Sequence, residues 1–559
     1  MSAPRVLLWA LIALLLWLVV YPNAFVAVDS FVDGGALTLR NYARFFSSPA
    51  ELTALWNSVW VSLVSVLLAT LIGVPLAFLF VRRDFPGRGI LGALVSLPVL
   101  LPPLIGVVAF MFLFGESGFV ARGVQALFGL ERVPWRFDGP VAILAVHAYT
   151  MYVYVFLFTA AGLARLDTGY SEAAASLGAS RFHALRRVTL PMLGPAIGGA
   201  ALLVFMTAMA SFSAPYVFGG GFRVLTTQVY TSRLNNESGL AAVETVILAL
   251  VSLAFLFAMQ RFEASRAYTG AGKGTGAAGQ GARALGAARA SDRPWLRTAL
   301  AIVVVLLLLL PHLTVLLMSF VPAGTWTVET FPPEYSLESY RALATQPQLL
   351  RPIANSLRMA TIATVANVAL AFVAGWLLVR TRLRGRRLLD TLVVLPWALP
   401  GTVIAVALAS TFAVNQPLAG RFLLVGTFWI LPLAYFIRNI PLVTRGAIAS
   451  FRQLDPSLEE AAASLGATRG TTARRVVLPL VLPGLAAGTS LAFVTALGEF
   501  VSSILLYTHS TRPISIEILS QLRAYDLGAA AAYGMLLIAL MSIAFVVGFR
   551  GVSGERPRE

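Results

Sequence analysis

The sequence predicts an all-α integral membrane protein with twelve transmembrane helices, arranged as two parallel six-helix repeats. Three observations support this fold class: an apolar composition, twelve hydrophobic segments and a long internal repeat. Hydrophobic residues make up 58% of the 559 residues and charged residues 12%. A soluble domain carries about 25% charged residues, so a lipid bilayer is the solvent that suits this chain.

Twelve segments are long enough to cross a bilayer, since a helix needs about 20 mostly apolar residues to do so. We expect the first segment to be retained, because its apolar part is long for a signal peptide and Tyr21-Pro22-Asn23 is a poor cleavage site. The predicted spans are 7–28, 57–81, 91–114, 140–164, 196–218, 240–260, 298–320, 355–379, 388–413, 421–444, 484–507 and 529–549.

Basic residues outnumber acidic ones by 42 to 25, for a net charge of +17. Such an excess can indicate nucleic-acid binding, but here the arginines lie between apolar segments, which is typical of the positive-inside bias of membrane proteins. We therefore expect membrane lipid and no nucleic acid as a partner. The basic segments 82–88, 261–297 and 380–387 should be cytoplasmic, the segments 29–54 and 321–353 periplasmic, and both termini cytoplasmic.

Metal and thiol chemistry have little support. The chain has no cysteine, and its four histidines (His147, His183, His312 and His509) are far apart in the sequence. The sequence therefore excludes disulfides and cysteine catalysis and predicts no catalytic residue, metal site or cofactor.

A Gly/Ala-rich stretch divides the chain into two halves. Residues 261–297 have the composition of a flexible linker, so we predict a first half at 1–260 and a second half at 298–559, with six spans each.

The two halves repeat each other. The string EAAASLGA occurs at 172–179 and again at 460–467, and flanking arginines, leucines and prolines recur at the same separation of 288 residues. Upstream the separation is 298 residues, so the first half carries about ten extra residues near 115–139. An even number of spans per repeat gives both halves one orientation, with a pathway expected between them.

Each repeated segment lies between the fourth and fifth spans of its half, on the predicted cytoplasmic side. Alanine favours helix, and Asp167 or Thr168 in one copy and Asp455 in the other are suitable helix starts. Gly178 and Gly466 can end this short helix. A second, arginine-bearing helix should follow and end at Pro191 or Pro479. Interfacial helices that only connect spans are the alternative, but they do not explain the same string twice.

The pattern Glu-Ala-Ala-x-x-x-Gly before the penultimate span of each half resembles the signature loop of permeases in binding-protein-dependent ABC importers. The resemblance covers nearly the whole chain and implies a type I ABC importer permease fold in a bacterial inner membrane. It further implies a cytoplasmic ATPase homodimer and a periplasmic substrate-binding protein as partners. The implied ATPase-coupling residues are Glu172, Ala173, Gly178, Glu460, Ala461 and Gly466.

The chain should not be an enzyme itself. It contains no Gly-x-x-x-x-Gly-Lys-Ser/Thr phosphate loop, and its one lysine, Lys273, lies in the linker. We therefore expect ATP hydrolysis in a separate subunit.

A charged residue inside a span is costly and commonly functional. Glu499 is such a residue and aligns with Ser211, so the sequence predicts a translocation path lined by Ser211, Ser213, Glu499, Ser502 and Ser503. Glu499 is nearly alone among the buried ionisable residues that the sequence indicates, and its alternative role is to cap or bond a neighbouring helix. Prolines 98, 102, 396 and 400 should bend the third span of each half.

The resemblance is closest to permeases for ferric iron, with thiamine, polyamine and phosphonate importers as relatives. Two other classes stay open. A secondary transporter driven by an ion gradient would need several buried ionisable residues, and a membrane-embedded enzyme would need a cluster of catalytic groups.

Overall fold

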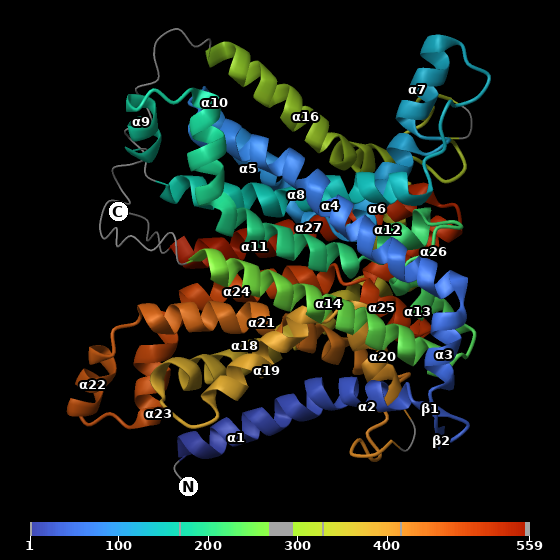
Figure 1. The fold of residues 1–559 in the computed structure, drawn as a ribbon. Coiled ribbons are helices and arrows are strands. Elements are labelled where there is room, and N and C mark those ends of the chain that lie inside the picture. Colours follow the sequence, from blue (N-terminus) through green and yellow to red (C-terminus); the bar gives the residue numbers. More distant parts are fainter. Residues whose placement is uncertain (1–2, 167–168, 268–293, 327–328, 414–415, 554–559) are drawn as a thin grey trace. The chain divides into compact units, whose positions relative to one another are not determined.

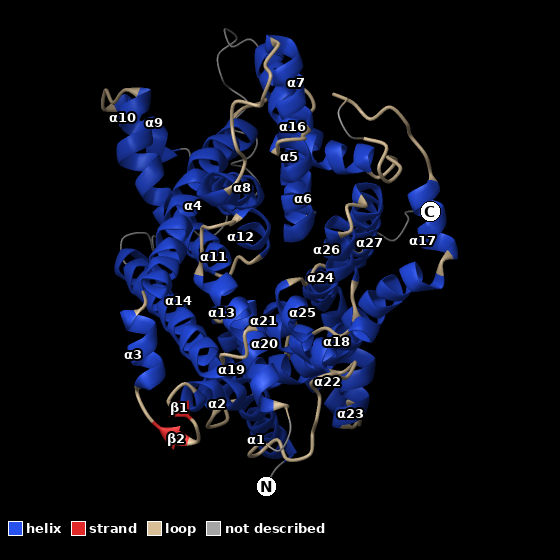
Figure 2. Ribbon diagram, turned by 90° about the vertical axis from the view of Figure 1, so that its right-hand side faces the viewer, coloured by secondary structure: helices blue, strands red, loops and turns tan. Residues whose placement is uncertain are grey.

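The computed structural model describes residues 3–166, 169–267, 294–326, 329–413 and 416–553. These residues are almost entirely helical (Figures 1 and 2). One short hairpin pairs β1 (Val32–Asp33) with β2 (Ala36–Leu37) in antiparallel register. The predicted all-α fold class is confirmed.

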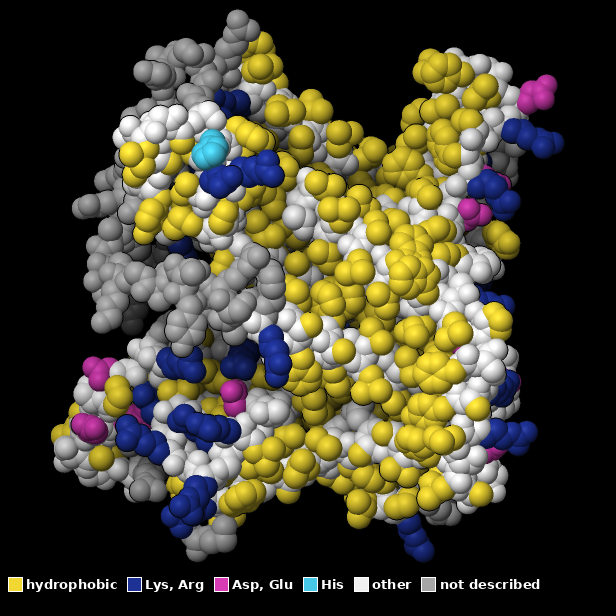
Figure 3. Space-filling view, viewed as in Figure 1, with side chains coloured by type: hydrophobic (Ala, Val, Ile, Leu, Met, Phe, Trp, Pro, Cys, Tyr) yellow, Lys and Arg dark blue, Asp and Glu magenta, His cyan; other side chains and the backbone are white. Residues whose placement is uncertain are grey.

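Within the described ranges, ten helices are long and apolar enough to cross a membrane, and an eleventh span is a bent pair. The ten are Pro4–Asp29, Pro49–Arg82, Pro103–Phe128, Gly139–Arg165, Phe182–Met209, Ser238–Arg261, Pro294–Met318, Pro347–Arg380, Gly470–Leu497 and Leu527–Gly548. In place of the tenth predicted span (421–444) lies α21 (Ile430–Gln453), which is largely buried and carries Arg438 and Arg445. On the face shown in Figure 3, apolar side chains predominate over the helices.

The chain forms two compact units that do not follow the order of the sequence. Unit 1 comprises residues 1–48, 228–249 and 316–559, and unit 2 comprises residues 49–227 and 250–315. Thus the first helix of the chain groups with the second half, and the first helix after the linker groups with the first half. The predicted division at 261–297 remains a division of the sequence, and residues 268–293 lie outside the described part.

Unit 1 begins with α1 (Ala3–Leu15), η1 (Leu16–Val20), α2 (Tyr21–Asp29) and α3 (Arg40–Ser47), and includes most of α13 (Leu225–Leu234) and the start of α14 (Ser238–Ala267). It continues with α17 (Glu338–Thr345), α18 (Pro347–Arg380), α19 (Arg386–Ala398), α20 (Gly401–Thr411), α21, α22 (Ser457–Ser464), α23 (Arg469–Thr472) and η4 (Ala473–Val477). The last elements are α24 (Leu478–Leu497), α25 (Val501–Leu506), η5 (His509–Thr511), α26 (Ile514–Arg523) and α27 (Leu527–Ser553).

The core of unit 1 is a bundle of α18, α21 and α24. Small residues let these helices approach closely, as is common between membrane helices: a Cβ on Gly375 would lie 3.0 Å from that of Ala447. The N-terminal helices pack on the same unit. Leu8 and Ile12 of α1 lie beside Gly385 at the start of α19, and Val26 of α2 belongs to one apolar cluster with residues of α20.

Unit 2 contains α4 (Pro49–Arg82), α5 (Arg88–Ser96), η2 (Leu97–Leu100), α6 (Pro103–Phe114), α7 (Phe119–Phe128), α8 (Gly139–Arg165) and α9 (Gly169–Ser176). It also contains α10 (Arg181–Ala184), η3 (Leu185–Thr189), α11 (Leu190–Met209), α12 (Ser213–Phe218) and most of α16 (Pro294–Met318). The insertion predicted near 115–139 forms the helix α7.

The helix α16 is part of the core of unit 2. Ala301 and Val305 are buried in a cluster with residues of α4, α5, α8 and α11. The Tyr149 hydroxyl of α8 donates to the Leu308 carbonyl at 2.7 Å. The helix that opens the second half thus completes the packing around α4 and α8.

Three of the predicted spans have wrong boundaries. The helices predicted at 196–218 and 484–507 end at Met209 and Leu497 and begin earlier, because Pro191 and Pro479 do not end the preceding helix. Each proline lies just after a five-residue π-helix, η3 or η4, that joins the short helix to the span. The changed hydrogen-bond spacing accommodates the missing proline N–H. The segment predicted at 421–444 is α21, which begins only at Ile430.

We expect Gly73→Ala to destabilise unit 2. A Cβ at Gly73 would lie 2.7 Å from both the Tyr152 carbonyl oxygen and the Val155 Cβ, and the facing backbone of α8 cannot yield cheaply. Such overpacking costs about 1–3 kcal/mol, so the melting temperature of the purified chain in detergent should fall. Gly123→Ala in α7 is the matched control, since a Cβ added at Gly123 would meet nothing within 4 Å. Equal melting temperatures for the two variants would contradict this packing.

Candidate functional site

The repeated string forms the same helix–turn–helix in each unit. In unit 2, α9 is followed by Gly178 and α10, and in unit 1, α22 is followed by Gly466 and α23. Figure 1 shows each pair of short helices at the end of the longer helices of its own unit. The predicted local structure is confirmed in both copies, while Asp167 and Thr168 lie outside the described residues.

The glycines end the first short helix in the left-handed conformation. Gly178 has φ +82° and Gly466 has φ +79°. In each copy the glycine N–H donates to the carbonyl three residues back and the next alanine N–H to the carbonyl five residues back. This is the Schellman arrangement, which favours glycine at the turn. Space around both glycines is open to at least 4 Å, so each turn faces outward.

The most exposed apolar side chain of each loop precedes the glycine. Leu177 is 88% exposed and Leu465 is 87% exposed. An exposed leucine alone is unremarkable, but the same exposure at equivalent positions of two repeats points to a contact surface. Both leucines stand in the repeated string, so the sequence carried the signal, although the predicted coupling residues do not include them.

The predicted coupling residues lie on these loops. Ala173, Gly178, Glu460, Ala461 and Gly466 are all exposed. Glu172 belongs to α9, but its side chain lies outside the described part of the structure. The arrangement is therefore two outward-facing turns, each with a leucine at its tip.

The second loop is held to its own unit by charge. The Arg380 Nε of α18 lies 2.9 Å from the Glu459 Oε1 of α22, and the Arg380 Nη2 donates to the Leu454 carbonyl at 2.6 Å. Asp455 precedes α22 and accepts the Ser457 N–H at 2.9 Å. These hydrogen bonds from Ser457 lower the pKa of the Asp455 carboxyl, as expected for a helix-start carboxylate.

A second cluster lies where α24 breaks before α25. The Glu499 Oε2 lies 2.9 Å from the Arg438 Nε of α21, and its Oε1 accepts the Ser502 N–H at 2.9 Å. The Ser503 hydroxyl donates to the Glu499 carbonyl at 2.6 Å and lies 2.7 Å from the Tyr435 hydroxyl. Glu499, Ser502 and Ser503 are buried. The Glu499 carboxylate therefore accepts a backbone N–H of the first turn of α25 and forms an ion pair with Arg438.

The break between α24 and α25 lies beside a second helix break, between α19 and α20. Helices α19 and α20 are bent by 106° at Leu399-Pro400, which confirms the predicted proline bend in the second half. The Ser502 hydroxyl lies 3.4 Å from the Gly401 carbonyl. A Cβ at Gly401 would collide with the Arg438 Nη1. A side chain at position 401 would therefore displace the guanidinium from its place beside the bend.

The prediction that Glu499 is nearly alone among buried ionisable residues is wrong, because Glu51, Arg122, Glu244 and Glu517 are buried as well. In addition, Arg438 pairs with Glu499. The arginine lies inside a predicted apolar span, and no linear pattern relates it to a residue 61 positions later. The interpretation of Glu499 as bonding a neighbouring helix is thus correct for this structure, and a role in a path is a proposal taken up below.

The equivalent place in unit 2 has a histidine and serines instead of an ion pair. The Ser211 hydroxyl lies 2.8 Å from the His147 Nε2, and the Ser65 hydroxyl lies 2.9 Å from the His147 Nδ1. Ser213 is buried at the start of α12, and its hydroxyl finds no partner among the described residues. Helices α6 and α12 pack together here, with Pro102 directly before α6. Both units thus bring two helix interruptions together, one closed by charge and one by hydrogen bonds.

We expect Arg438→Gln to lower the stability of unit 1 by about 3–5 kcal/mol, because it leaves the buried Glu499 carboxylate without its counter-charge. Glu499→Gln should cost less, because the arginine that it leaves unpaired is 33% exposed. The double variant should recover a large part of that loss, since it removes both charges together. Chemical denaturation of the purified chain, followed by tryptophan fluorescence, measures the cycle. Additive losses in the double variant would show that the two side chains do not interact.

The comparison with protein families gives two matches. The family described as "Binding-protein-dependent transport system inner membrane component" matches residues 69–268 and 367–550. Each match contains one copy of the repeated helix–turn–helix and the helix break that follows it. The family is therefore present twice in one chain, as the internal repeat predicts.

Individual relatives agree. A probable ABC transporter permease protein, y4fN, from Sinorhizobium fredii is 32% identical over 498 residues, or 88% of this chain and 86% of the relative. The ferric transport system permease protein FbpB of Actinobacillus pleuropneumoniae is 27% identical over 563 residues, or 98% of this chain and 78% of the relative. The sulfate transport system permease protein CysT of Salmonella typhimurium is 36% identical over 214 residues, or 37% of this chain and 77% of the relative. The chain is a transport component rather than an enzyme, and it belongs to the family of binding-protein-dependent transport system inner membrane components, with two permease halves fused in one polypeptide.

Proposed function

We propose that this chain is the membrane-spanning permease of an ATP-driven importer in a bacterial inner membrane, with both termini cytoplasmic. The observation that carries the proposal is the pair of outward-facing turns, each presenting an exposed leucine and a left-handed glycine at equivalent positions. Two equivalent docking elements suit a two-fold partner. We assign that partner as a cytoplasmic ATPase homodimer, and a periplasmic protein as the source of substrate.

The mechanism we propose is alternating access. Closure of the ATPase dimer on ATP would move the two loops together, and the spans behind them would rock around a central path. The helix breaks at Ser211 and Glu499 are the candidate lining of that path, together with Ser213, Ser502 and Ser503. Unwound backbone at membrane depth is tolerated where it is buried in protein or lines a cavity, so interruptions of this kind are expected beside a pathway.

We propose ferric iron as the substrate. Support comes from relatives named as ferric transport permeases, one of which aligns over 98% of this chain. A sulfate-type oxyanion is the second candidate, because a relative named as a sulfate permease is 36% identical over 214 residues. Thiamine, polyamines and phosphonates stay as further substrates of the same machinery. A secondary transporter would lack a use for the two docking loops.

Titration of the purified periplasmic protein encoded beside this chain separates the substrates. We expect tight binding of ferric iron, measured by calorimetry, and none of sulfate, thiamine, spermidine or aminoethylphosphonate. Tight binding of one of the others would replace iron as the substrate and leave the permease role intact.

The double variant Leu177→Ser/Leu465→Ser should weaken docking of the ATPase. Burial of one leucine contributes about 1.5–3 kcal/mol, so loss of both should lower the affinity for the ATPase by at least about tenfold. Pull-down of the ATPase and coupled uptake in proteoliposomes measure the effect. Leu127→Ser is the control, since Leu127 is 78% exposed but lies on α7. Wild-type uptake by the double variant would refute the docking role of these turns.

A further inference from the structure

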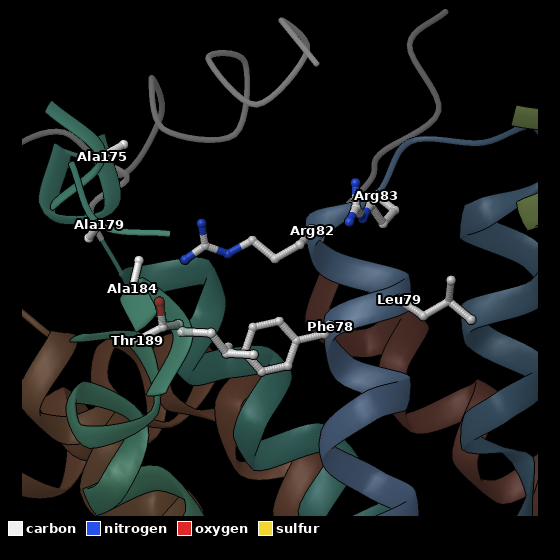
Figure 4. A pocket seen from close by; sticks show the side chains of 9 residues that line it. Phe78, Leu79, Arg82, Arg83, Ala175, Ala179, Ala184 and Thr189 are labelled. Carbon is white, nitrogen blue, oxygen red and sulfur yellow. The ribbon is translucent and has the colours of Figure 1, made fainter. Parts of the chain in front are cut away.

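We call the segment from α9 to η3 (residues 169–189) the first docking loop. A cavity of about 400 Å³ lies between the end of α4 and this loop, within unit 2. Figure 4 shows its lining, with the Arg82 side chain extending from the end of α4 toward the segment from α9 to η3. The end of α4 contributes Phe78, Leu79 and Arg82, and the loop contributes Ala175, Leu185 and Thr189. The cavity is therefore apolar on most sides and basic at one end.

Two nitrogens of the Arg82 guanidinium lack a partner among the described residues. Its Nε and Nη2 are shielded from solvent, and no hydrogen-bond acceptor among the described residues contacts them. A buried donor left unsatisfied is unfavourable, the more so when it carries charge. The cavity beside it has room for an acceptor. The geometry therefore calls for an anionic group from outside the described chain.

The second repeat shows what such an acceptor does. Arg380 is equivalent to Arg82 by the separation of 298 residues that relates the upstream parts of the repeats. It is bound by the Glu459 carboxylate and the Leu454 carbonyl. The position equivalent to Glu459, 288 residues earlier, is Ser171. The first repeat thus keeps the arginine and lacks the carboxylate.

We propose that this cavity binds the phosphate group of an anionic phospholipid, with Arg82 as its main ligand. The cavity is lined by the end of the long helix α4 and by residues from α9 to η3, and its lining does not include Leu177 or Gly178 at the tip of the loop. The site therefore lies on the side of the loop next to a membrane helix. Phe78 and Leu79 lie one turn below Arg82 on α4 and provide an apolar wall for the start of an acyl chain. Basic pockets between membrane helices near the cytoplasmic surface are known to bind anionic headgroups.

The bound phosphate would do for the first loop what Glu459 does for the second. It links the end of a long membrane helix to a short docking helix and so fixes the direction in which the loop points. The assignment to the cytoplasmic leaflet rests on the proposed topology, while the phosphate site itself rests on the cavity and on Arg82. One docking loop is then secured by the chain and the other by lipid.

The test uses the full-length chain in nanodiscs of phosphatidylcholine with or without phosphatidylglycerol, with bound phosphatidylglycerol counted by native mass spectrometry and stability followed by melting. The wild-type chain should retain phosphatidylglycerol and melt at a higher temperature in its presence. Arg82→Gln should bind it about fivefold more weakly, the factor that corresponds to roughly 1 kcal/mol per arginine at a membrane surface.

Two further variants make the result specific. Arg380→Gln should keep wild-type binding of phosphatidylglycerol, because that arginine is already occupied. Ser171→Glu would restore the carboxylate of the second repeat, and should therefore abolish retention of the lipid while it raises the melting temperature in pure phosphatidylcholine. This outcome is independent of Arg82→Gln and of any loss of folding in that variant.

Three results would overturn the proposal. One is unchanged retention of phosphatidylglycerol by both Arg82→Gln and Ser171→Glu. Another is equal stabilisation of the wild-type chain by inorganic phosphate in pure phosphatidylcholine, which would identify a site for a soluble anion. The third is a loss of ATPase affinity in Arg82→Gln with no change in lipid retention, which would identify a carboxylate of the ATPase as the partner. Because lipid retention is measured on the isolated chain, failure here is distinct from failure of the importer role.

Discussion

The ion pair between Arg438 and Glu499 holds together the place where two interrupted helices of unit 1 meet. Helix α24 stops before Glu499, and α19 turns into α20 at Pro400, so backbone groups left free by two helix ends accumulate in a buried place and need partners from the protein. The carboxylate satisfies the Ser502 N–H and the guanidinium at once, and Gly401 leaves the space for the arginine. The interruption is stable because the Glu499 carboxylate binds both a backbone N–H and the Arg438 guanidinium, and because Gly401 has no side chain to occupy the space of that guanidinium.

The two repeats use one plan with different chemistry. In unit 2 a buried histidine between two serines occupies the place of the charged pair. Likewise the arginine at the end of the long helix has a carboxylate partner in unit 1 and a cavity in unit 2. The exposed turns have the same form in both halves, which suits the two-fold partner that we propose, while the inner contacts differ between the halves. Because the two halves belong to one polypeptide, their inner contacts can differ, while the exposed turns would have to stay alike to bind the symmetric partner that we propose.

The parts that depend on local pattern were predictable from the sequence. The repeated string predicted both turns and their glycines, because a left-handed residue after an alanine-rich helix leaves a local signature. The continuous helices through Pro191 and Pro479 were not predictable by the usual rule, since a π-helix changes the spacing that makes proline unfavourable. Arg438 was hidden for another reason: pairing across 61 residues is set by the tertiary fold, and an arginine within an apolar window carries no sign of its partner. The helix α7 was not predictable either, since the repeat offset gives the length of the insertion near 115–139 but not its conformation.

The exchange of first helices between the compact units has a consequence for biosynthesis. Helices α4 to α12 emerge from the ribosome before α16, yet Ala301, Val305 and the Leu308 carbonyl of α16 belong to their core. Until more than half of the polypeptide has been made, the part of this core that α16 supplies is missing, and the Tyr149 hydroxyl cannot reach the Leu308 carbonyl. The packing of α1 and α2 against α19 and α20 is completed later still, because α19 and α20 begin only at Arg386 and Gly401. Fusion of the halves keeps each waiting helix tethered to the chain that will complete it, so neither half has to find its complement by diffusion in the membrane.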